Sequence, residues 1–399
     1  MDGSLDLPGL DTSKPTISSA VMKTHFWAFI IPVILFFACS PKQRDLSNAY
    51  IDSFSEESDA DFFREVFSDI RAIPMDLADH LLGSNAFLRF EKADDGFLLT
   101  DRQTGSIYLL DGDGSLLTHI SKIGRGPGEY NEIQHATYKN HRIIVLADGS
   151  HVIEYTESGD LVKEAVFEEW FADIAPLEEN GYALFEYRNF GENEVEDRII
   201  ITDSAFVKKR SFLPLEYQLF NYGALTFGVV GEKGRYLCVQ QSSPVIYKCD
   251  RDTVITTYTF DLHKKEFPAK MLEADDYETI LEVLTGTPDM YGIASAFENR
   301  DYLLLALSHL VDGDESRIGH WLINKKDLDS RIEYQDLKGP LFEFFGPPQL
   351  LTADNEVVYV CEASLYDTVM DLVPGLSDVA NVFQEGSPDN VLLFCKIAK

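Results

Sequence analysis

The sequence predicts an all-β fold, a six-bladed β-propeller of four-stranded blades, from three observations. Aromatic residues, which favour strands, are abundant, with 27 Phe and 18 Tyr in 399 residues. Beyond residue 65, short runs of strand-forming residues alternate with turn residues, and few segments have the apolar spacing of a helix. These runs also recur along the chain, as they do in repeat architectures.

The repeat is clearest in residues 96–121 and 141–167, which each contain three strands joined by two turns. Four weaker copies follow them. A residue near the start of the first strand of each copy marks steps of 46, 39, 54, 66 and 55 residues: Phe97, Ile143, Tyr182, Tyr236, Tyr302 and Val357. Units of this size with four strands each are typical of propeller blades. A seven-bladed propeller and a double sandwich are the structural alternatives.

The last copy reaches the C-terminus without an outermost strand. Residues 65–75 could supply that strand, which would close the ring and protect its sheet edges. Residues 264–286 carry apolar residues at helical spacing, so we expect a helical insertion there.

The N-terminal residues are not expected to belong to the propeller, which we place at residues 65–399. Residues 22–38 combine a basic start with a short apolar run and a small residue before Cys39, as in a bacterial lipoprotein signal. Cleavage there would leave Cys39 to carry the lipid. Residues 1–21 lack targeting character and predict a non-native or mis-started extension, and residues 39–64 predict a tether ending in a short helix. An uncleaved anchor or a chance apolar run are the alternatives.

Charge and cysteine usage narrow the function classes. Lys and Arg number 34 against 67 Asp and Glu, a formal charge of -33, which argues against nucleic acid as a partner. The four cysteines beyond Cys39 lie in apolar runs without a C-x-x-C pair, so we expect buried free thiols rather than a zinc or redox motif. The pair to test for a disulfide is Cys361 with Cys395, because both are expected on neighbouring strands.

The most distinctive loop is ISKIGRGPGEY, residues 120–130, called here the glycine loop. It lacks the Lys and the following helix of a Walker loop. Glu129 or Asn131 stands where a dinucleotide-binding loop needs its third glycine, so both phosphate-binding interpretations fail.

The glycine loop instead predicts a defined turn from the rim of one blade to the channel side of the next. Its glycines can take backbone angles closed to other residues, and its proline favours an extended residue before it. The residues expected to shape the turn are Gly124, Gly126, Pro127 and Gly128. The side chains expected to form a binding site at the channel mouth are Arg125, Glu129 and Tyr130.

This loop, together with an aromatic strand in SPVIYKCDRD and the terminal DNVLLFCKIAK, resembles the six-bladed β-propeller lipoproteins of Bacteroidetes. The resemblance covers residues 65–399 and the lipoprotein signal. It implies a fold and an envelope location, and almost nothing about activity.

Two further kinds of sequence pattern suggest cation sites, namely closely spaced carboxylates and closely spaced histidines. DGDGS at 111–115 and DGDES at 312–316 space carboxylates by two residues, but Leu116 and Arg317 stand where a calcium loop needs glycine, so we expect hairpin turns. His135, His141 and His151 are close in sequence, yet strand alternation gives no reason for them to share a face. Core or solvent-facing histidines are the favoured interpretation, and no metal ligand or cofactor is assigned.

These observations together predict a non-catalytic, ligand- or protein-binding propeller, anchored in the cell envelope through Cys39 and facing the periplasm or the surface from the outer membrane. The expected partners are a ligand or an envelope protein, with the membrane reached through the lipid. The alternative is a propeller enzyme of the lyase or hydrolase type, with a loop-built and metal-dependent site at the channel mouth.

Overall fold

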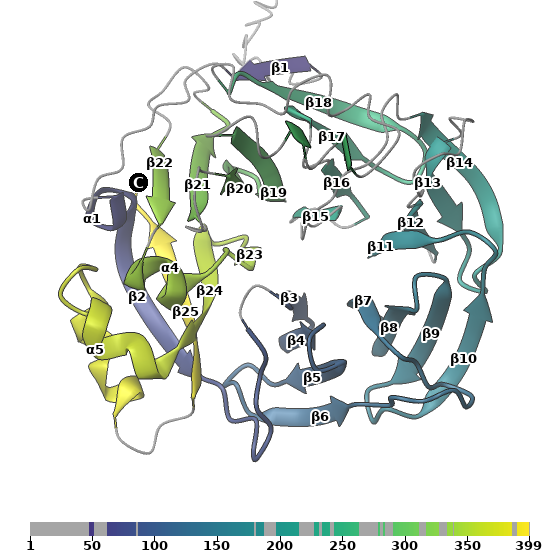
Figure 1. The fold of residues 1–399 in the computed structure, drawn as a ribbon, viewed down its shortest axis with the longest axis horizontal. Coiled ribbons are helices and arrows are strands. Elements are labelled where there is room, and N and C mark those ends of the chain that lie inside the picture. Colours follow the sequence, from purple (N-terminus) through teal and green to yellow (C-terminus); the bar gives the residue numbers. More distant parts are fainter. Residues whose placement is uncertain are drawn as a thin grey trace, which may run out of the picture. The chain divides into compact units, whose positions relative to one another are not determined.

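Six blades of β-strands follow one another around a ring in residues 45–399, with the innermost strand of each blade nearest the centre and the outermost strands at the rim (Figure 1). A computed structural model describes the chain at residues 48–51, 62–84, 87–178, 181–186, 197–214, 227–230, 234–239, 243–262, 278–279, 282–283, 290–310, 317–326, 333–337, 339–384 and 389–398. The expected extension, signal and lipidation residue Cys39 lie outside these residues.

The first three blades are separate antiparallel sheets, and their strands run from inside to outside in chain order. The first blade contains β3 (Leu88–Ala93), β4 (Gly96–Asp101), β5 (Ser106–Leu110) and β6 (Leu116–Ile120). The second contains β7 (Ile133–Lys139), β8 (Arg142–Ala147), β9 (His151–Thr156) and β10 (Leu161–Val166). The third contains β11 (Phe171–Pro176), β12 (Tyr182–Glu186), β13 (Asp197–Thr202) and β14 (Lys208–Pro214).

The fourth and fifth blades are joined by a short parallel pairing between their innermost strands β15 and β19, so they form one nine-stranded sheet. The fourth contains β15 (Phe227–Val230), β16 (Tyr236–Val239), β17 (Val245–Cys249) and β18 (Val254–Phe260). The fifth contains β19 (Met290–Glu298), β20 (Tyr302–Leu310), β21 (Arg317–Asn324) and β22 (Glu333–Leu337).

The sixth blade closes the ring with a strand from the beginning of the propeller. Its strands are β23 (Leu350–Leu351), β24 (Glu356–Glu362), β25 (Asn390–Ile397) and β2 (Phe67–Pro74). Strand β2 pairs antiparallel with β25, with Ile70 opposite Cys395, so the predicted closing strand is confirmed. Arg71 of β2 also lies over the ring of Phe394 and forms an ion pair with Glu356 at 3.1 Å. These contacts join the closing strand β2 to β25 and β24.

Short helices lie beside the fifth and sixth blades. They are α1 (Phe62–Val66), α4 (Pro340–Phe345), α5 (Tyr366–Val369) and the 3₁₀ turns η2 (Ala363–Leu365) and η3 (Leu376–Phe383). The helix expected at the end of the tether is therefore present as α1. Most of the predicted helical insertion lies outside the described residues, and the parts within them, 278–279 and 282–283, are helical. In the described part of the chain, no helix is long and apolar enough to span a membrane.

The segment predicted as a tether contributes a strand of its own. β1 (Asn48–Ile51) pairs parallel with β18 at the outer edge of the fourth blade. Ala49 and Ile51 are buried in the hydrophobic cluster between the fourth and fifth blades. The outermost strand of the fourth blade is therefore paired, and the shorter β1 is the edge strand in its place.

The repeat markers occupy equivalent places in the blades. Each marker is the first or second residue of the second strand in its blade, for example Phe97 in β4 and Tyr302 in β20. The run interpreted from sequence as the first strand of each copy is therefore the second strand, and the innermost strand precedes it. The six-bladed prediction is confirmed, and the alternatives of seven blades or a double sandwich are wrong.

The core lies between neighbouring blades, where each interface of the described residues holds a hydrophobic cluster. Strand β8 shows how one strand serves two interfaces. Ile143 and Val145 join the cluster shared with the first blade, while Ile144 and Leu146 join the one shared with the third. Both faces of the blade are thus buried, which explains why the sequence of a strand such as β8 is a continuous apolar run.

The four described cysteines are buried and free: Cys238, Cys249, Cys361 and Cys395. The expectation of buried thiols is therefore confirmed. Cys361 and Cys395 do lie on neighbouring strands, but Cys361 faces Val391 and Cys395 faces Val357 in the register. This offset separates the two thiols along the sheet, so the pair considered for a disulfide is not bonded.

Candidate functional site

The glycine loop joins the outermost strand of the first blade, β6, to the innermost strand of the second, β7, as its sequence predicts. The loop is closed by its own main chain. The N–H of Gly124 donates to the carbonyl of Tyr130 at 2.9 Å, and the N–H of Tyr130 donates to the carbonyl of Lys122 at 3.0 Å. Within the loop, the N–H of Gly126 donates to the Glu129 carboxylate at 2.7 Å.

The glycines have different roles, and only one of those in the turn has a left-handed backbone. Gly128 has a φ of 67°, which strongly favours glycine. Gly124 and Gly126 do not have a positive φ. The expectation that the glycines of the loop use backbone angles closed to other residues is therefore wrong for these two. At Gly124 an added Cβ would lie 2.1 Å from the Glu129 carboxylate and would displace it from its hydrogen bond with Gly126.

The loop is fastened to the outer strands of the second blade through Gly128. Its N–H donates to the Glu164 carboxylate of β10 at 2.8 Å, and its carbonyl accepts from the Tyr155 hydroxyl of β9 at 2.6 Å. His151 of β9 lies 3.1 Å from the same Glu164 carboxylate. The loop therefore lies over β9 and β10, which place it toward the rim (Figure 1).

Tyr130 is a core residue, so its assignment to the channel mouth is corrected. The side chain is fully buried in the hydrophobic cluster between the first and second blades. Its hydroxyl donates to the carbonyl of Gly105 at 3.0 Å and accepts from the N–H of Lys122 at 3.3 Å. Burial raises the pKa of this phenol to about 12, so it stays protonated as a donor.

Arg125 and Glu129, the other two side chains of the predicted site, line a pocket of about 520 Å³. Its walls come from the glycine loop, from the β8–β9 turn and from the end of β10. The remaining lining residues are Gly124, Gly126, Pro127, Asn131, Asp148, His151, Glu164, Ala165 and Val166. A volume of this size is in the range of small-molecule sites, and the pocket lies beside β9 and β10 rather than on the innermost strand.

Three carboxylates of the pocket are held in place by main-chain donors. Besides Glu129 and Glu164, Asp148 accepts the N–H groups of Asn131 and Glu132 at 3.0 and 3.1 Å. Arg125 is the guanidinium of the pocket, and it is exposed and makes no hydrogen bond or ion pair with the described residues. The lining is thus acidic on balance, which favours a ligand group with positive charge.

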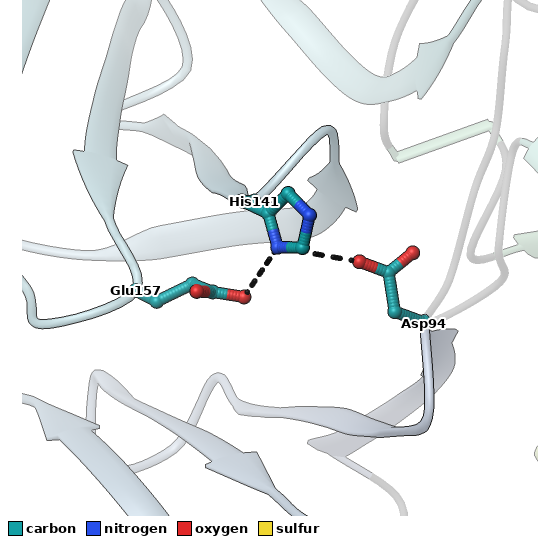
Figure 2. A group of neighbouring side chains, drawn as sticks. All are labelled: Asp94, His141 and Glu157. Carbon is teal, nitrogen blue, oxygen red and sulfur yellow. Dashed lines mark hydrogen bonds and ion pairs between the residues drawn. The ribbon is translucent and has the colours of Figure 1, made fainter.

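The three histidines noted in the sequence lie in three separate places, as strand alternation predicts. His151 is in the pocket, where it pairs with Glu164. His141, in the turn before β8, lies near Asp94 and Glu157 (Figure 2). His135 is buried on β7 among the innermost strands.

The His135 group links the innermost strands of three blades, and no local sequence signal reveals it. Its Nε2 lies 3.0 Å from Glu91 of β3, and its Nδ1 lies 2.5 Å from Asp173 of β11. Thr137 donates a further hydrogen bond to Glu91 at 2.8 Å. Burial alone lowers the pKa of His135, but the two carboxylates outweigh it and raise that pKa to about 10. A protonated histidine is thus enclosed by its partners.

One of the two calcium-like patterns can be examined. DGDGS at 111–115 forms the turn between β5 and β6, where the Asp111 carboxylate accepts the N–H groups of Asp113 and Ser115, both at 2.9 Å. The predicted hairpin turn is therefore confirmed at this position. The second pattern, at 312–316, lies outside the described residues.

Comparison with solved structures supports the fold. The chain is similar to a protein of Bacteroides fragilis whose name describes it as exported, with 14% identity, a TM-score of 0.66, and coverage of 88% of this chain and 100% of that one. It is also similar to a member of the DUF4221 family from Bacteroides vulgatus, with 9% identity, a TM-score of 0.51, and coverage of 84% and 98%. These likenesses confirm the predicted resemblance to six-bladed propellers of Bacteroidetes.

Sequence comparison gives the family. No curated protein matches the chain. The family profile described as "Domain of unknown function (DUF4934)" matches residues 51–384, which includes β2 and the six blades up to η3. The chain therefore belongs to the DUF4934 family.

Proposed function

We propose that this protein is a non-catalytic binding module of the cell envelope, anchored by a lipid on Cys39, whose pocket beside the glycine loop accepts a positively charged group of its ligand. The observation that carries the proposal is the pocket itself, with its three oriented carboxylates. The similar Bacteroides fragilis protein is named as an exported protein, which supports a location outside the cytoplasm.

The arrangement of the pocket favours binding over proton transfer. Each of the three carboxylates is oriented by main-chain N–H groups, which fixes its position before any ligand arrives. Preorganised acceptors lower the entropic cost of binding an ammonium or guanidinium group. Arg125 stands exposed at the same pocket and can meet a carboxylate or carbonyl of the ligand.

The pocket is tested by the thermal stability of the purified protein with two probes, agmatine as a dication and succinate as a dianion. We expect agmatine to raise the Tm and Glu129→Gln or Glu164→Gln to weaken that effect at least tenfold in apparent affinity. Glu343→Gln, which removes an exposed carboxylate on α4, is the matched control and leaves the effect unchanged. A preference for succinate, or an agmatine effect that both pocket variants retain, contradicts the proposed charge of the ligand.

The anchor is tested separately by labelling cells that express the full chain with radioactive palmitate. We expect labelled protein in the membrane fraction, sensitivity of its processing to globomycin, and loss of the label in Cys39→Ser. Unlabelled protein in the soluble fraction contradicts the anchor without affecting the pocket.

A further inference from the structure

We infer that Asp94, His141 and Glu157, whose carboxylates accept hydrogen bonds from Tyr138, form a binding site for a zinc-class divalent cation between the first and second blades. The site is distinct from the pocket described above. His141 comes directly before β8 and Asp148 of the pocket directly after it, so the two sites lie at opposite ends of a six-residue strand. A strand of that length spans about 20 Å.

The candidate ligand atoms converge from three turns of two blades. Asp94 lies in the β3–β4 turn of the first blade, His141 in the β7–β8 turn and Glu157 in the β9–β10 turn of the second (Figure 2). One ligand atom from each of these three residues lies within 4.8 Å of the other two. The phenol oxygen of Tyr138, at the end of β7, contacts all three side chains.

The spacing of the imidazole nitrogen from the two carboxylates suits an ion bound between them. His141 Nδ1 lies 3.2 Å from Glu157 Oε1 and 3.5 Å from Asp94 Oδ2. The Tyr138 oxygen lies 3.4 Å from His141 Nδ1 and 3.1 Å from Asp94 Oδ2, and it also contacts Glu157. A tetrahedral ion with bonds of about 2.1 Å separates two of its ligands by about 3.4 Å, which is close to the distances of His141 Nδ1 from Glu157 Oε1 and from Asp94 Oδ2.

The ligand types select the class of ion. Zinc accepts an imidazole nitrogen together with carboxylate oxygens, whereas calcium and magnesium prefer oxygen ligands alone. The side chains of His141, Asp94 and Glu157 are 71%, 57% and 44% exposed, so an ion can reach them from solvent.

The charge of the group also distinguishes it from an ordinary surface network. In the described residues, neither Asp94 nor Glu157 forms an ion pair with a lysine or arginine. The group therefore carries two carboxylates against one imidazole, and a divalent cation would balance them.

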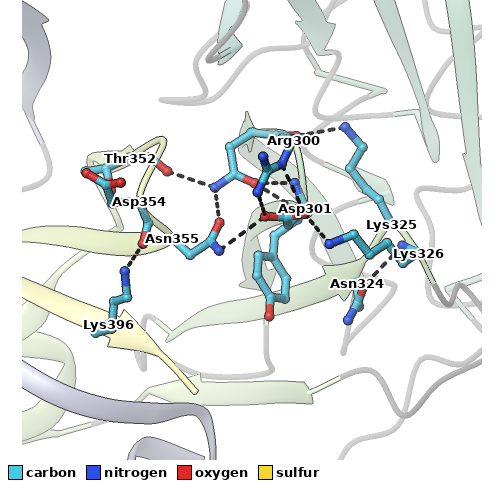
Figure 3. Close-up of polar contacts among 11 residues, drawn as sticks. Arg300, Asp301, Asn324, Lys325, Lys326, Thr352, Asp354, Asn355 and Lys396 are labelled. Carbon is cyan, nitrogen blue, oxygen red and sulfur yellow. Dashed lines mark hydrogen bonds and ion pairs between the residues drawn. The ribbon is translucent and has the colours of Figure 1, made fainter. Parts of the chain in front are cut away.

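The corresponding turns of the fifth and sixth blades show the contrast (Figure 3). There Asp301 lies 2.6 Å from Lys326 and 3.1 Å from Arg300, and it accepts a hydrogen bond from Asn355. Bonds from Lys326 and then Arg300 hold the pKa of Asp301 well below its usual range. A lysine and an arginine pair directly with this carboxylate, whereas in the described residues the positive groups that act on Glu157 are His141, which pairs with it, and Arg142, which acts without an ion pair.

The test is isothermal titration of the purified full-length protein with Zn²⁺, together with Ca²⁺ in a separate titration. We expect one equivalent of Zn²⁺ to bind and Ca²⁺ to bind at least tenfold more weakly. His141→Asn removes the imidazole and suits the φ of 58° at this position, because asparagine tolerates left-handed angles. This variant and Glu157→Gln should each lose at least tenfold in Zn²⁺ affinity.

The matched control is His80→Asn, which removes another exposed imidazole and leaves the three ligands in place. Its Zn²⁺ affinity should equal that of the unchanged protein. Circular dichroism of each variant shows whether the fold is kept. The inference is overturned if no Zn²⁺ binds, if His141→Asn binds it unchanged, or if Ca²⁺ binds more tightly than Zn²⁺.

Discussion

The Tyr130 hydroxyl donates a hydrogen bond to the main-chain carbonyl of Gly105 across 3.0 Å, which joins the glycine loop to the turn between β4 and β5 of the first blade. This bond lies within the hydrophobic cluster that the first and second blades share. The loop that seemed from sequence to present Tyr130 to a ligand thus uses it to hold two blades together.

Tyr130→Phe should therefore lower stability and spare the pocket. The change removes the bond to Gly105 and leaves that carbonyl and the N–H of Lys122 without this partner, at a cost of about 1–3 kcal/mol. Urea unfolding followed by fluorescence measures the free energy. Tyr50→Phe, which removes a solvent-exposed hydrogen bond from β1 to Asp261, is the control and should change it by less than about 0.5 kcal/mol. Equal effects of the two changes would show that the buried bond contributes nothing.

Gly128→Ala should destabilise the loop more than Gly126→Ala. At Gly128 the φ of 67° costs an alanine about 1–2 kcal/mol, and the added Cβ would lie 3.1 Å from the Leu161 side chain. At Gly126 the added Cβ meets only the end of the Glu129 side chain, which can move. Thermal unfolding of both variants gives the comparison, and a larger loss for Gly126→Ala would contradict the assigned roles.

The His135 group should make the free energy of unfolding fall as the pH rises into the alkaline range. Because the folded-state pKa is raised to about 10 from 6.5, the contribution of His135 is fully present below pH 6.5 and is lost as the pH rises toward 10. His135→Gln removes the charge between Glu91 and Asp173 and should cost about 3–5 kcal/mol at pH 6.

Denaturant unfolding at several values between pH 6 and pH 10 checks this dependence. The unchanged protein should lose stability steadily over this interval, and His135→Gln should show a flatter profile. Parallel profiles for the two proteins would mean that His135 does not carry the dependence.

The thiols should be inert in the folded protein and all reactive after unfolding. Burial raises the pKa of the thiols of Cys361 and Cys395 well above its usual value, so little thiolate is present at pH 8. Iodoacetamide without reductant should label neither in the native state and both in denaturant, as mass spectrometry can show. Two labels missing after denaturation would indicate the disulfide that the register excludes.

Sequence patterns predict the fold well because the forces that set it leave periodic traces. Strands such as β8 are apolar on both faces, since each blade is packed between two others, and they give the repeating apolar runs. The closing strand β2 could be assigned because its partner β25 lacked a neighbour. The innermost strands were not identified from sequence, since the run interpreted as the first strand of each copy is the second strand of its blade.

The candidate sites could be predicted only in part. Arg125 and Glu129 line a pocket beside β9 and β10 instead of the channel mouth where they were predicted, and their role in binding stays a prediction. The same local reasoning misplaced Tyr130, since burial depends on the neighbouring blade and not on the loop. The carboxylates Asp148 and Glu164 carry no signal in the sequence that relates them to this loop.

The sequence by itself determined the six blades and the closing strand, because alternation and burial are properties of short segments. Only the tertiary structure decided which polar side chains meet. Asp94 reaches His141, and Glu91 reaches His135, because two blades lie side by side around the ring. That placement comes from packing between whole sheets. It brings together residues from different turns and strands, and no local sequence pattern predicts which residues meet.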